Sequence, residues 1–276
     1  MATTASQGPE EVAPPAAPLL LARGVSKSFG AVQALVDVDF EVHAGEVVAL
    51  VGDNGAGKST LIKAIAGVQP GEAGEYLFEG RKVSIHTPQD AQRLGIATVY
   101  QDLALCDNLD VVANLYLGRE VVMSGVPGAL RILDEVTMEG RTTELLTSLS
   151  VTTLGSVRTE VGSLSGGQRQ SVAIARSLLG EPKLVILDEP TAALGVSQTE
   201  QVLDQIGRLR ERGLGVVVIS HNLHNVFYVA DRIVVLRLGR RTATFERRST
   251  TQEEVVAAIT GAVRAELHAG HGGAGA

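Results

Sequence analysis

The sequence predicts an α/β fold with a mostly parallel core sheet, and three observations support this prediction. Three short runs are apolar throughout, as in strands that helices cover on both faces, at residues 47–51, 184–187 and 216–219. Segments with helical spacing, 198–212 and 223–229, separate or follow the last two runs. The first run leads into a glycine-rich stretch and then into another helical segment. This alternation of strand and helix is typical of a parallel sheet between helices.

Local spacing and turn residues predict the other elements. Strands are expected at 19–29, 35–42, 76–78, 83–85, 96–100 and 233–236, and a final pair of short strands after these. Helices are expected at 61–66, 89–94, 111–117, 137–149, 169–176 and 253–259, with Thr137 as the N-cap of the fourth. Residues of about 88–180 are predicted as a mostly helical insert. We expect residues 1–18 to be a disordered tail and residues 263–276 a flexible Gly/Ala tail.

Bulk composition limits the class of protein. The chain has 276 residues, enough for a full α/β core, and its net charge of −7 lacks the basic footprint of a nucleic-acid-binding domain. No apolar run approaches the roughly 18 residues of a membrane span, and Glu10 and Glu11 argue against a secretion signal. A single cysteine, Cys106, fits a reducing compartment. We therefore expect a soluble, cytoplasmic protein whose main partner is not nucleic acid.

The glycine-rich stretch 52–60, Gly-Asp-Asn-Gly-Ala-Gly-Lys-Ser-Thr, predicts a phosphate-binding loop. Gly52, Gly55 and Gly57 let the backbone curl until its N–H groups point at one anion. Lys58 adds positive charge for the outer phosphates, and the Ser59 hydroxyl can bind Mg²⁺. A turn that merely joins strand to helix is the alternative, but the strand, the spacing, the lysine and the serine are all in register. The nucleotide contacts are expected to include the other loop residues Asn54, Ala56 and Thr60.

Two carboxylates end the apolar run at 184–187. Asp188 suits a Mg²⁺ ligand, directly or through water, as at the corresponding strand end of phosphate-loop ATPases. Glu189 points differently and could polarise the water that attacks the γ-phosphate. Plain surface charge is the alternative; the phosphate loop in the same chain favours the catalytic pair.

The residues Leu-Ser-Gly-Gly-Gln at 164–168, here called the signature segment, precede a strong helix. Ser165, Gly166, Gly167 and Gln168 expose backbone N–H groups at a helix N-terminus, which predicts a second anion site. One chain with one phosphate loop has little use for two such sites unless they serve different nucleotides. Two chains that meet head to tail, each completing the other's site, satisfy both segments.

Together with Gln101 and His221, these motifs resemble the nucleotide-binding domain of ABC transporters over residues 19–262. The signature segment is the most specific part of this resemblance, since many NTPases share the phosphate loop. The resemblance implies a P-loop NTPase core with an antiparallel β-subdomain and a helical subdomain. It also implies that the chain binds ATP with Mg²⁺ and hydrolyses the ATP.

The resemblance also implies roles for individual residues. Phe29 corresponds to the aromatic residue that stacks on adenine, although an ordinary half-exposed aromatic is the alternative. Gln101 corresponds to the glutamine that contacts Mg²⁺ and the attacking water and senses the membrane partner. Ser165 and Gly167 would touch the γ-phosphate bound by the other protomer. His221 corresponds to the histidine that clamps the γ-phosphate, so the implied catalytic set is Lys58, Gln101, Glu189 and His221.

The chain departs from the family pattern at one position. The family usually has aspartate after Pro190-Thr191-Ala192-Ala193-Leu194, and this chain has Gly195. That aspartate helps to couple the two sites of the dimer, so coupling here would rest on backbone contacts. Hydrolysis itself is expected to survive.

The stretch 95–109 and the residues 117–119 are similar to ATP-binding subunits of monosaccharide importers of the ribose, xylose and fructose type. The resemblance implies a homodimer on the inner face of the cell membrane, with permease subunits as direct partners and an extracytoplasmic sugar-binding protein as an indirect one. Leu103, Leu105 and Leu109 would lie near the groove for the permease, or would pack in the helical insert; the sequence favours neither alternative.

Three other functions remain open from the sequence. A translation or DNA-repair ATPase of the same family is expected to carry paired domains, a coiled coil or a basic patch, none of which is visible here. A regulatory module that holds ATP without turnover conflicts with an intact Glu189 and His221. Import of another solute stays within the family, and the identity of the sugar does not follow from this chain.

Overall fold

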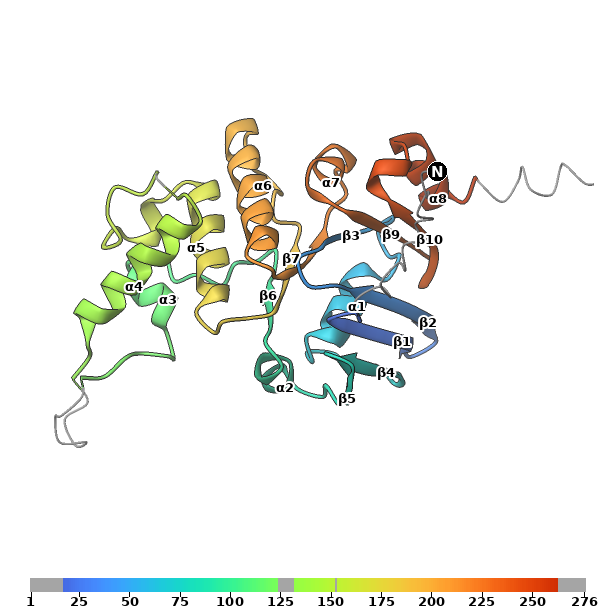
Figure 1. Cartoon of the computed structure of the whole chain (residues 1–276), viewed down its shortest axis with the longest axis horizontal. Coiled ribbons are helices and arrows are strands. Elements are labelled where there is room, and N and C mark those ends of the chain that lie inside the picture. Colours follow the sequence, from blue (N-terminus) through green and yellow to red (C-terminus); the bar gives the residue numbers. More distant parts are fainter. Residues whose placement is uncertain (1–16, 124–131, 152, 263–276) are drawn as a thin grey trace, which may run out of the picture.

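The computed structural model describes residues 17–123, 132–151 and 153–262, which form two sheets with helices around them (Figure 1). Of the predicted N-terminal tail 1–18, residues 1–16 lie outside the described residues, as does the whole predicted tail 263–276. The strands are β1 Leu20–Phe29, β2 Val32–Val42, β3 Val47–Val51, β4 Ala73–Phe78, β5 Arg81–Val83, β6 Ile96–Val99, β7 Leu184–Asp188, β8 Gly215–Ile219, β9 Arg232–Arg237 and β10 Arg240–Glu246. The helices are α1 Lys58–Ile65, α2 Pro88–Arg93, α3 Val111–Tyr116, α4 Glu135–Ser148, α5 Gly166–Leu178, α6 Val196–Glu211, α7 Leu223–Val229 and α8 Gln252–Thr260.

The larger sheet has the strand order β10-β9-β3-β8-β7-β6, and the predicted parallel core is confirmed. Neighbouring strands from β9 to β6 run parallel, and only β10 is antiparallel to β9. The predicted final pair of strands is wrong in one respect: after β10 the chain forms a short 3₁₀ turn, Arg247–Ser249, instead of a second strand. Helix α8 then packs against β9 and β10.

Both faces of this sheet are buried, which explains the unbroken apolar runs. In β3, Val48 and Leu50 belong to a core with α1 and the smaller sheet, whereas Val47 packs with the helices of the other face. Helix α1 is therefore enclosed between the two sheets, as Figure 1 shows near its centre. The phosphate loop that precedes α1 is anchored at both ends by buried elements.

The smaller sheet is antiparallel, with the strand order β2-β1-β4-β5. It corresponds to the antiparallel β-subdomain that the resemblance implies. Its last strand, β5, lies about two residues earlier in the chain than the predicted strand at 83–85.

Helices α3, α4 and α5 form the part of the molecule at the left of Figure 1. They lie between β6 and β7 in the chain, and β6 itself pairs with β7 in the main sheet. Within the segment 88–180 the helical region therefore begins after β6, and the division into insert and core remains a prediction. Thr137 is not the N-cap of α4: the Asp134 carboxylate caps the helix by accepting from the Thr137 N–H at 3.1 Å and the Thr137 hydroxyl at 2.7 Å. Carboxylates are strong N-caps, so the helix starts one turn earlier.

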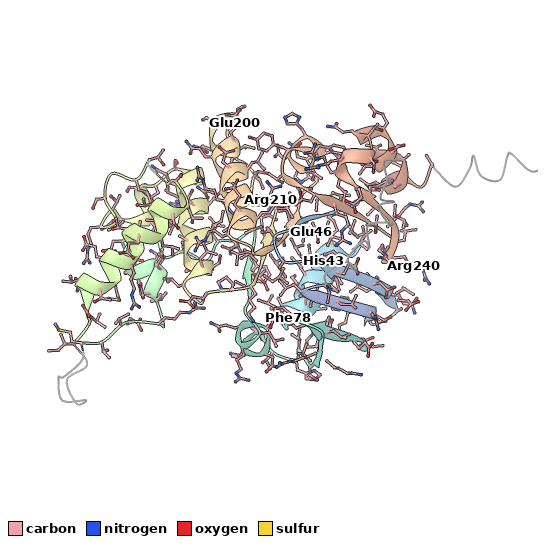
Figure 2. All side chains as sticks on the ribbon, in the orientation of Figure 1. His43, Glu46, Phe78, Glu200, Arg210 and Arg240 are labelled. Atoms are coloured by element: carbon pink, nitrogen blue, oxygen red, sulfur yellow. The ribbon has the colours of Figure 1, made fainter. Side chains whose placement is uncertain are left out.

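The edge of the main sheet where β3 begins is held by an ionic cluster. The buried Arg232 donates to both carboxylate oxygens of Glu46, at 2.7 and 3.0 Å, and to Glu41 at 3.1 Å. Figure 2 shows Glu46 beside His43, near the start of β3. A guanidinium that is buried needs such partners, because an unpaired charge would be costly to desolvate. This edge is structural, and the predicted site motifs gather at the opposite edge.

Candidate functional site

The sheet register brings the predicted motifs to one edge. Leu50 of β3 and Asp188 of β7 both lie opposite Ile219 of β8, and Val99 of β6 lies opposite Leu187. Each strand ends at or just after these positions, so the phosphate loop, His221, Glu189 and Gln101 leave the sheet side by side, from β3, β8, β7 and β6 in that spatial order. Crevices at the carboxyl ends of parallel strands are the usual ligand site of open α/β sheets. We call this row of strand ends the carboxyl edge.

The phosphate loop needs glycine at two positions for steric reasons. Gly52 has φ 150°, and a Cβ there would collide with the Leu236 carbonyl oxygen. Gly57 has φ 105°, and a Cβ there would lie 2.7 Å from the Ala34 carbonyl oxygen. The loop is thus held in a closely packed curl that side chains at these positions would not permit.

The loop fits a phosphate group. Gly57 is the N-cap of α1 and supplies no side-chain cap, so the N–H groups of the first turn have no partner from it. Lys58 is buried, and its Nζ donates to the carbonyl oxygens of Gly52 at 2.7 Å and Asp53 at 2.9 Å. Burial lowers the pKa of Lys58, and Glu189, Asp53 and Asp188 partly oppose that shift. A phosphate group would supply the negative charge and acceptors that this positive, partly desolvated centre lacks.

Asp188 fits a ligand for a divalent cation. Burial and the neighbouring Glu189 raise its pKa, while Lys63 and Lys58 lower it. Within the described residues, no group of three or more His, Cys, Asp or Glu side chains could hold a metal. Mg²⁺ that binds with a nucleotide needs only one or two carboxylates, since phosphates and water complete its shell. The predicted ligands Ser59, Gln101 and Asp188 therefore suit nucleotide-bound Mg²⁺ better than a permanent metal centre.

Glu189 and His221 form the closest side-chain pair of the carboxyl edge. His221 Nδ1 lies 2.9 Å from Glu189 Oε2, with the histidine side chain 73% exposed and the glutamate 16% exposed. Glu189 has φ 50°, and its N–H donates to the Ile219 carbonyl at 3.0 Å. Such a left-handed conformation is strained for a residue with a Cβ, and it is typical of functional positions.

Gln101 and Phe29 are also predicted site residues, and in the described part of the chain neither is hydrogen-bonded to the residues just discussed. Gln101 is exposed and lies two residues after the end of β6. Phe29 is the last residue of β1 and is 45% exposed, with Lys27 Nζ 5.5 Å from the ring centroid. The ring is accessible to a purine, and the lysine holds it by a cation–π contact.

The signature segment lies on α5 and faces α6 instead of the phosphate loop. Ser165 is the N-cap of α5, and its Oγ accepts from the Gln168 N–H at 3.4 Å. Ser165 and Gly166 are exposed, whereas Gly167 is buried against Gln198 of α6. In the described part of the chain, no hydrogen bond or ion pair joins this segment to the phosphate loop.

Gln168, a predicted nucleotide contact, has both ends of its amide engaged within the chain. Its Oε1 accepts from the Ser165 N–H at 2.9 Å and its Nε2 donates to the Thr153 carbonyl at 2.8 Å. This is a capping box, whose spacing of Ser and Gln is visible in the sequence. The structure thus shows that Gln168 stabilises the segment, and its contact with nucleotide remains a prediction.

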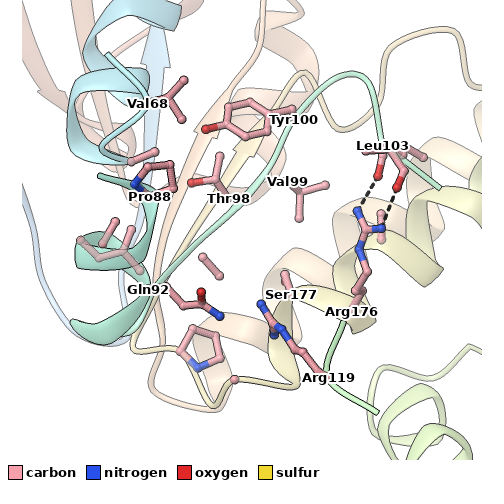
Figure 3. Close-up of a pocket in the computed structure, with 18 of the residues that line it drawn as sticks. Val68, Pro88, Gln92, Thr98, Val99, Tyr100, Leu103, Arg119, Arg176 and Ser177 are labelled. Carbon is pink, nitrogen blue, oxygen red and sulfur yellow. Dashed lines mark hydrogen bonds between the residues drawn. The ribbon is translucent and has the colours of Figure 1, made fainter. Parts of the chain in front are cut away.

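A cavity of about 500 Å³ lies beside the carboxyl edge, next to Gln101. It is enclosed between α2, β6, α3 and α5 and is lined in part by Tyr100, Leu103 and Arg119 (Figure 3). The Arg176 guanidinium fixes its wall by donating to the carbonyls of Leu103 at 2.6 Å and Ala104 at 2.7 Å. Leu103 also packs against the helical core, as Leu105 does, so both predicted placements of these leucines have some support.

Sequence reasoning missed the residues that tie these parts together. Asn225 of α7 donates to the Thr191 hydroxyl at 3.1 Å, and Gln205 of α6 donates to the Ser171 hydroxyl at 2.7 Å. One of these residues had a signal in the sequence, because Gln205 is a polar residue at a position where the helical spacing of α6 expects an apolar one. It lies among the buried Val202, Ile206 and Leu209.

Comparisons with known proteins agree with this geometry. Residues 35–192 match the family described as ABC transporter. A fructose import ATP-binding protein of Rhizobium meliloti is 46% identical over 246 residues, 89% of this chain and 95% of that protein. A xylose/arabinose import ATP-binding protein of Sulfolobus acidocaldarius is 44% identical over 242 residues, 88% and 94% of the two chains.

Solved structures also resemble the fold. A nucleotide-free ATP-binding cassette from an ABC transporter has a TM-score of 0.76 at 25% identity, covering 91% of this chain and 99% of that one. A dimeric cassette in a post-hydrolysis state, bound to ADP and Pi, has a TM-score of 0.69 at 26% identity, covering 84% and 100%. With a family match over more than half of its length and relatives this similar, the chain belongs to the ABC transporter family of ATPases.

Proposed function

We propose that this chain is the ATP-hydrolysing subunit of a sugar importer, in which two copies close head to tail on two ATP molecules. The observation that carries the proposal is the exposed signature segment, which has the form of an anion site and no phosphate loop of its own chain beside it. The relatives that resemble the chain over most of their length are import proteins for fructose and for xylose or arabinose. A simple sugar is therefore the proposed cargo.

ATP binding begins at the phosphate loop. The N–H groups of 52–60 and of the first turn of α1 bind the phosphates. The Lys58 ammonium exchanges the Gly52 and Asp53 carbonyls for phosphate oxygens, which better offset its charge. Phe29 stacks on the base. Mg²⁺, held by Ser59, Asp188 and Gln101, would neutralise phosphate charge when bound.

Hydrolysis is assigned to the pair Glu189 and His221. Glu189 accepts a proton from the attacking water, and His221, 2.9 Å away, fixes the carboxylate and reaches the γ-phosphate side. Because Glu189 is mostly buried in a conformation set by its backbone bond to Ile219, it is held ready for this role.

The second copy completes the site. Ser165 uses its oxygen as an acceptor for the helix cap, which leaves the hydroxyl proton for the partner's γ-phosphate. Gly167 contributes the N–H of the first turn of α5. The structural neighbour in a dimeric state bound to ADP and Pi supports this arrangement.

Coupling to the membrane is assigned to the cavity beside Gln101. A permease segment that enters it would touch the wall that Arg176 holds through Leu103 and Ala104, directly after Gln101. Leu105 and Leu109 follow in the chain, and neither lines the cavity itself. None of the described helices could span a membrane. Because the similar proteins are named as import ATP-binding proteins, we assign the channel to a separate permease, at which this subunit would sit peripherally on the inner face. An extracytoplasmic sugar-binding protein would act on that permease and not on this chain.

The test is to purify the tagged chain from native membranes and identify what accompanies it. A permease should co-purify, and ATPase activity should rise when its binding protein is loaded with sugar. Phosphate release stimulated by ribosomes or DNA, with no permease present, would contradict the proposal in favour of a translation or repair role. ATP binding without phosphate release would instead indicate a regulatory module, and a binding protein loaded with another solute would change the cargo.

A further inference from the structure

A buried hydrogen-bond chain joins helix α6 to the first turn of α5. The Gln205 Nε2 donates to the Ser171 hydroxyl at 2.7 Å, and the Ser171 hydroxyl donates to the Gly167 carbonyl at 2.9 Å. Both side chains are 4% exposed. Gly167 belongs to the signature segment, so a buried group of α6 reaches the backbone of the second anion site in two steps.

The same two helices also interlock sterically at the glycine pair. A Cβ at Gly167 would lie 2.9 Å from Gln198 Cβ, and a Cβ at Gly166 would lie 3.0 Å from the Leu194 Cδ2. Leu194 and Gln198 flank the start of α6, which begins at Val196. The first turn of α5 is therefore set against α6 at the glycines and again at Ser171.

The other end of this interface leads to the catalytic pair. Leu194 follows Glu189 by five residues, and the Thr191 hydroxyl between them accepts from Asn225 at 3.1 Å. Asn225 is buried on α7, the helix that directly follows His221 and Asn222. A continuous set of packed and hydrogen-bonded groups thus connects Glu189 of one nucleotide site with the signature segment that serves the other.

Stability alone does not account for Gln205. Its Nε2 is bonded, but its Oε1 is a buried acceptor without a hydrogen-bond partner among the described residues. A buried polar group left without a partner destabilises the folded state, whereas an apolar side chain of the same shape would not. An oriented polar contact that is retained at such a cost is expected where it fixes geometry.

We infer that Ser171 and Gln205 are positioning residues for the hydrolysis reaction. They fix the rotation of α5 against α6, so that Ser165 and Gly167 face the partner's nucleotide in step with the segment that carries Glu189. With Gly195 in place of aspartate, this interface inside each chain links the two sites. The inference rests on the head-to-tail dimer of the proposed function.

The test replaces Gln205 by methionine, which keeps the length of the side chain and removes both the bond and the buried acceptor. We expect the melting temperature to stay at or above the parental value, because loss of the bond is offset by removal of the unpaired buried acceptor. The ATP affinity of the single protomer should stay at the parental value, because the phosphate loop is untouched. The kcat of ATP hydrolysis should fall roughly 2- to 30-fold, the range of residue couplings between sites. The Hill coefficient for ATP should move towards one.

Further variants separate positioning from packing. Ser171→Ala breaks the same chain and should show the same loss of kcat, and Ser171→Thr, which keeps the hydroxyl, should recover it. Gln201→Met on the exposed face of α6 is the matched control and should hydrolyse ATP at the parental rate.

Parental kcat and Hill coefficient in both Gln205→Met and Ser171→Ala, measured beside an active parental dimer, would overturn this inference alone. A fall in melting temperature and in protomer ATP affinity with an unchanged Hill coefficient would also overturn it, because it would show a structural role. Failure of the parental protein to hydrolyse ATP would overturn the proposed function together with this inference.

Discussion

The carboxyl edge and the signature segment are both anion sites, but only the first has its chemistry around it. At the carboxyl edge, a lysine, two carboxylates and a histidine lie at the ends of neighbouring strands, with Glu189 and His221 2.9 Å apart. The signature segment presents a serine hydroxyl and helix N–H groups, and the described bonds of its side chains, among Ser165, Gln168 and Thr153, stabilise the segment itself. The phosphate loop accordingly lies in a site that a second chain would only complete. The signature segment would form part of a nucleotide site only when the phosphate loop of a second chain lies beside it.

This difference also shows in charge. The carboxyl edge contains groups whose pKa values are shifted by burial and by one another, notably Lys58 and Asp188. The segment at 164–168 holds no ionisable side chain. Ionisable groups with shifted pKa values are typical of the place where the reaction occurs, which favours the carboxyl edge. Neutral hydrogen-bond donors can only stabilise charge, which is the role expected of the signature segment. Most predictions below change a residue of the carboxyl edge or of the signature segment and leave the other site intact.

Glu189→Gln should produce the largest loss. Removing a general base costs about 10²–10⁴-fold in rate, while the phosphate loop that binds ATP is unchanged. The variant should therefore retain ATP, accumulate as a closed dimer in size-exclusion chromatography and release almost no phosphate. His221→Gln is the companion variant, and hydrolysis by Glu189→Gln at the parental rate would show that the base is misassigned.

Ser165→Asp tests the signature segment without disturbing its helix. Aspartate is as good an N-cap as serine, but it would place a negative charge against the partner's γ-phosphate. Since loss of one donor to a charged reaction centre costs about 10²-fold or more, we expect at least that loss of kcat with protomer ATP affinity unchanged. Ser165→Asn keeps the cap without charge and should lose much less.

Mixing the Ser165→Asp variant with a Lys58→Ala variant tests whether each nucleotide site is built from the phosphate loop of one chain and the signature segment of the other. In a mixed dimer one site has both defects and the other has none. Half of the dimers in an equal mixture are mixed, so about one quarter of the parental activity should return if the two sites act independently. No recovery of hydrolysis, together with no ATP retained by the mixed dimers, would contradict a site built from both chains, whereas ATP retained at one site without hydrolysis would show that the two sites are coupled.

The carboxyl edge could be predicted from the sequence because each of its residues directly follows an apolar strand. Asp188, Glu189 and His221 need only the rule that parallel strands end at one edge, and the register confirms their neighbourhood. The lysine contact of Phe29 joins residues two positions apart on β1, which share one face of a strand, so the spacing indicates this contact as well.

The surroundings of the signature segment could be predicted only in part. The Ser165 and Gln168 spacing already contains the capping box, so that contact was available. The bond from Gln205 to Ser171 joins residues 34 positions apart on different helices. Spacing within one helix shows that Gln205 lies on a buried face, but the identity of its partner depends on how α5 and α6 pack.

Phe29→Ala should weaken ATP binding at the carboxyl edge and leave the signature segment unaffected. Loss of a base–aromatic stack costs about 1–3 kcal/mol, which corresponds to roughly 5- to 150-fold in Kd measured by calorimetry. Phe29→Tyr preserves the ring and should bind like the parent. An unchanged Kd in the alanine variant would leave Phe29 as an ordinary half-exposed aromatic.

Asp188→Asn should stabilise the nucleotide-free protein, on the order of 1 kcal/mol, while it abolishes Mg²⁺-dependent hydrolysis. The pKa of Asp188 is raised, by burial first and then by Glu189, so the folded state holds its proton to higher pH than the unfolded chain. Parental stability therefore falls as pH rises from 3.8 through the raised value, and then levels off. The advantage of the variant in urea unfolding should grow across that window. A constant difference between pH 3 and 8 would contradict this assignment.

Gly195→Asp should have the smallest effect on ATP hydrolysis. It tests most directly how the signature segment is coupled to the carboxyl edge. Gly195 is the N-cap of α6 with φ −70° and ψ 167°, has no side-chain cap, and a Cβ there would meet nothing within 4 Å. Aspartate fits that conformation and would cap α6, a gain of only a few tenths of a kcal/mol over glycine. If the interface between α5 and α6 already couples the two sites, the new carboxylate should leave kcat and the Hill coefficient unchanged. A rise of the Hill coefficient in Gly195→Asp would instead show that the native chain couples its sites weakly, and that the signature segment depends on a side chain which this protein lacks.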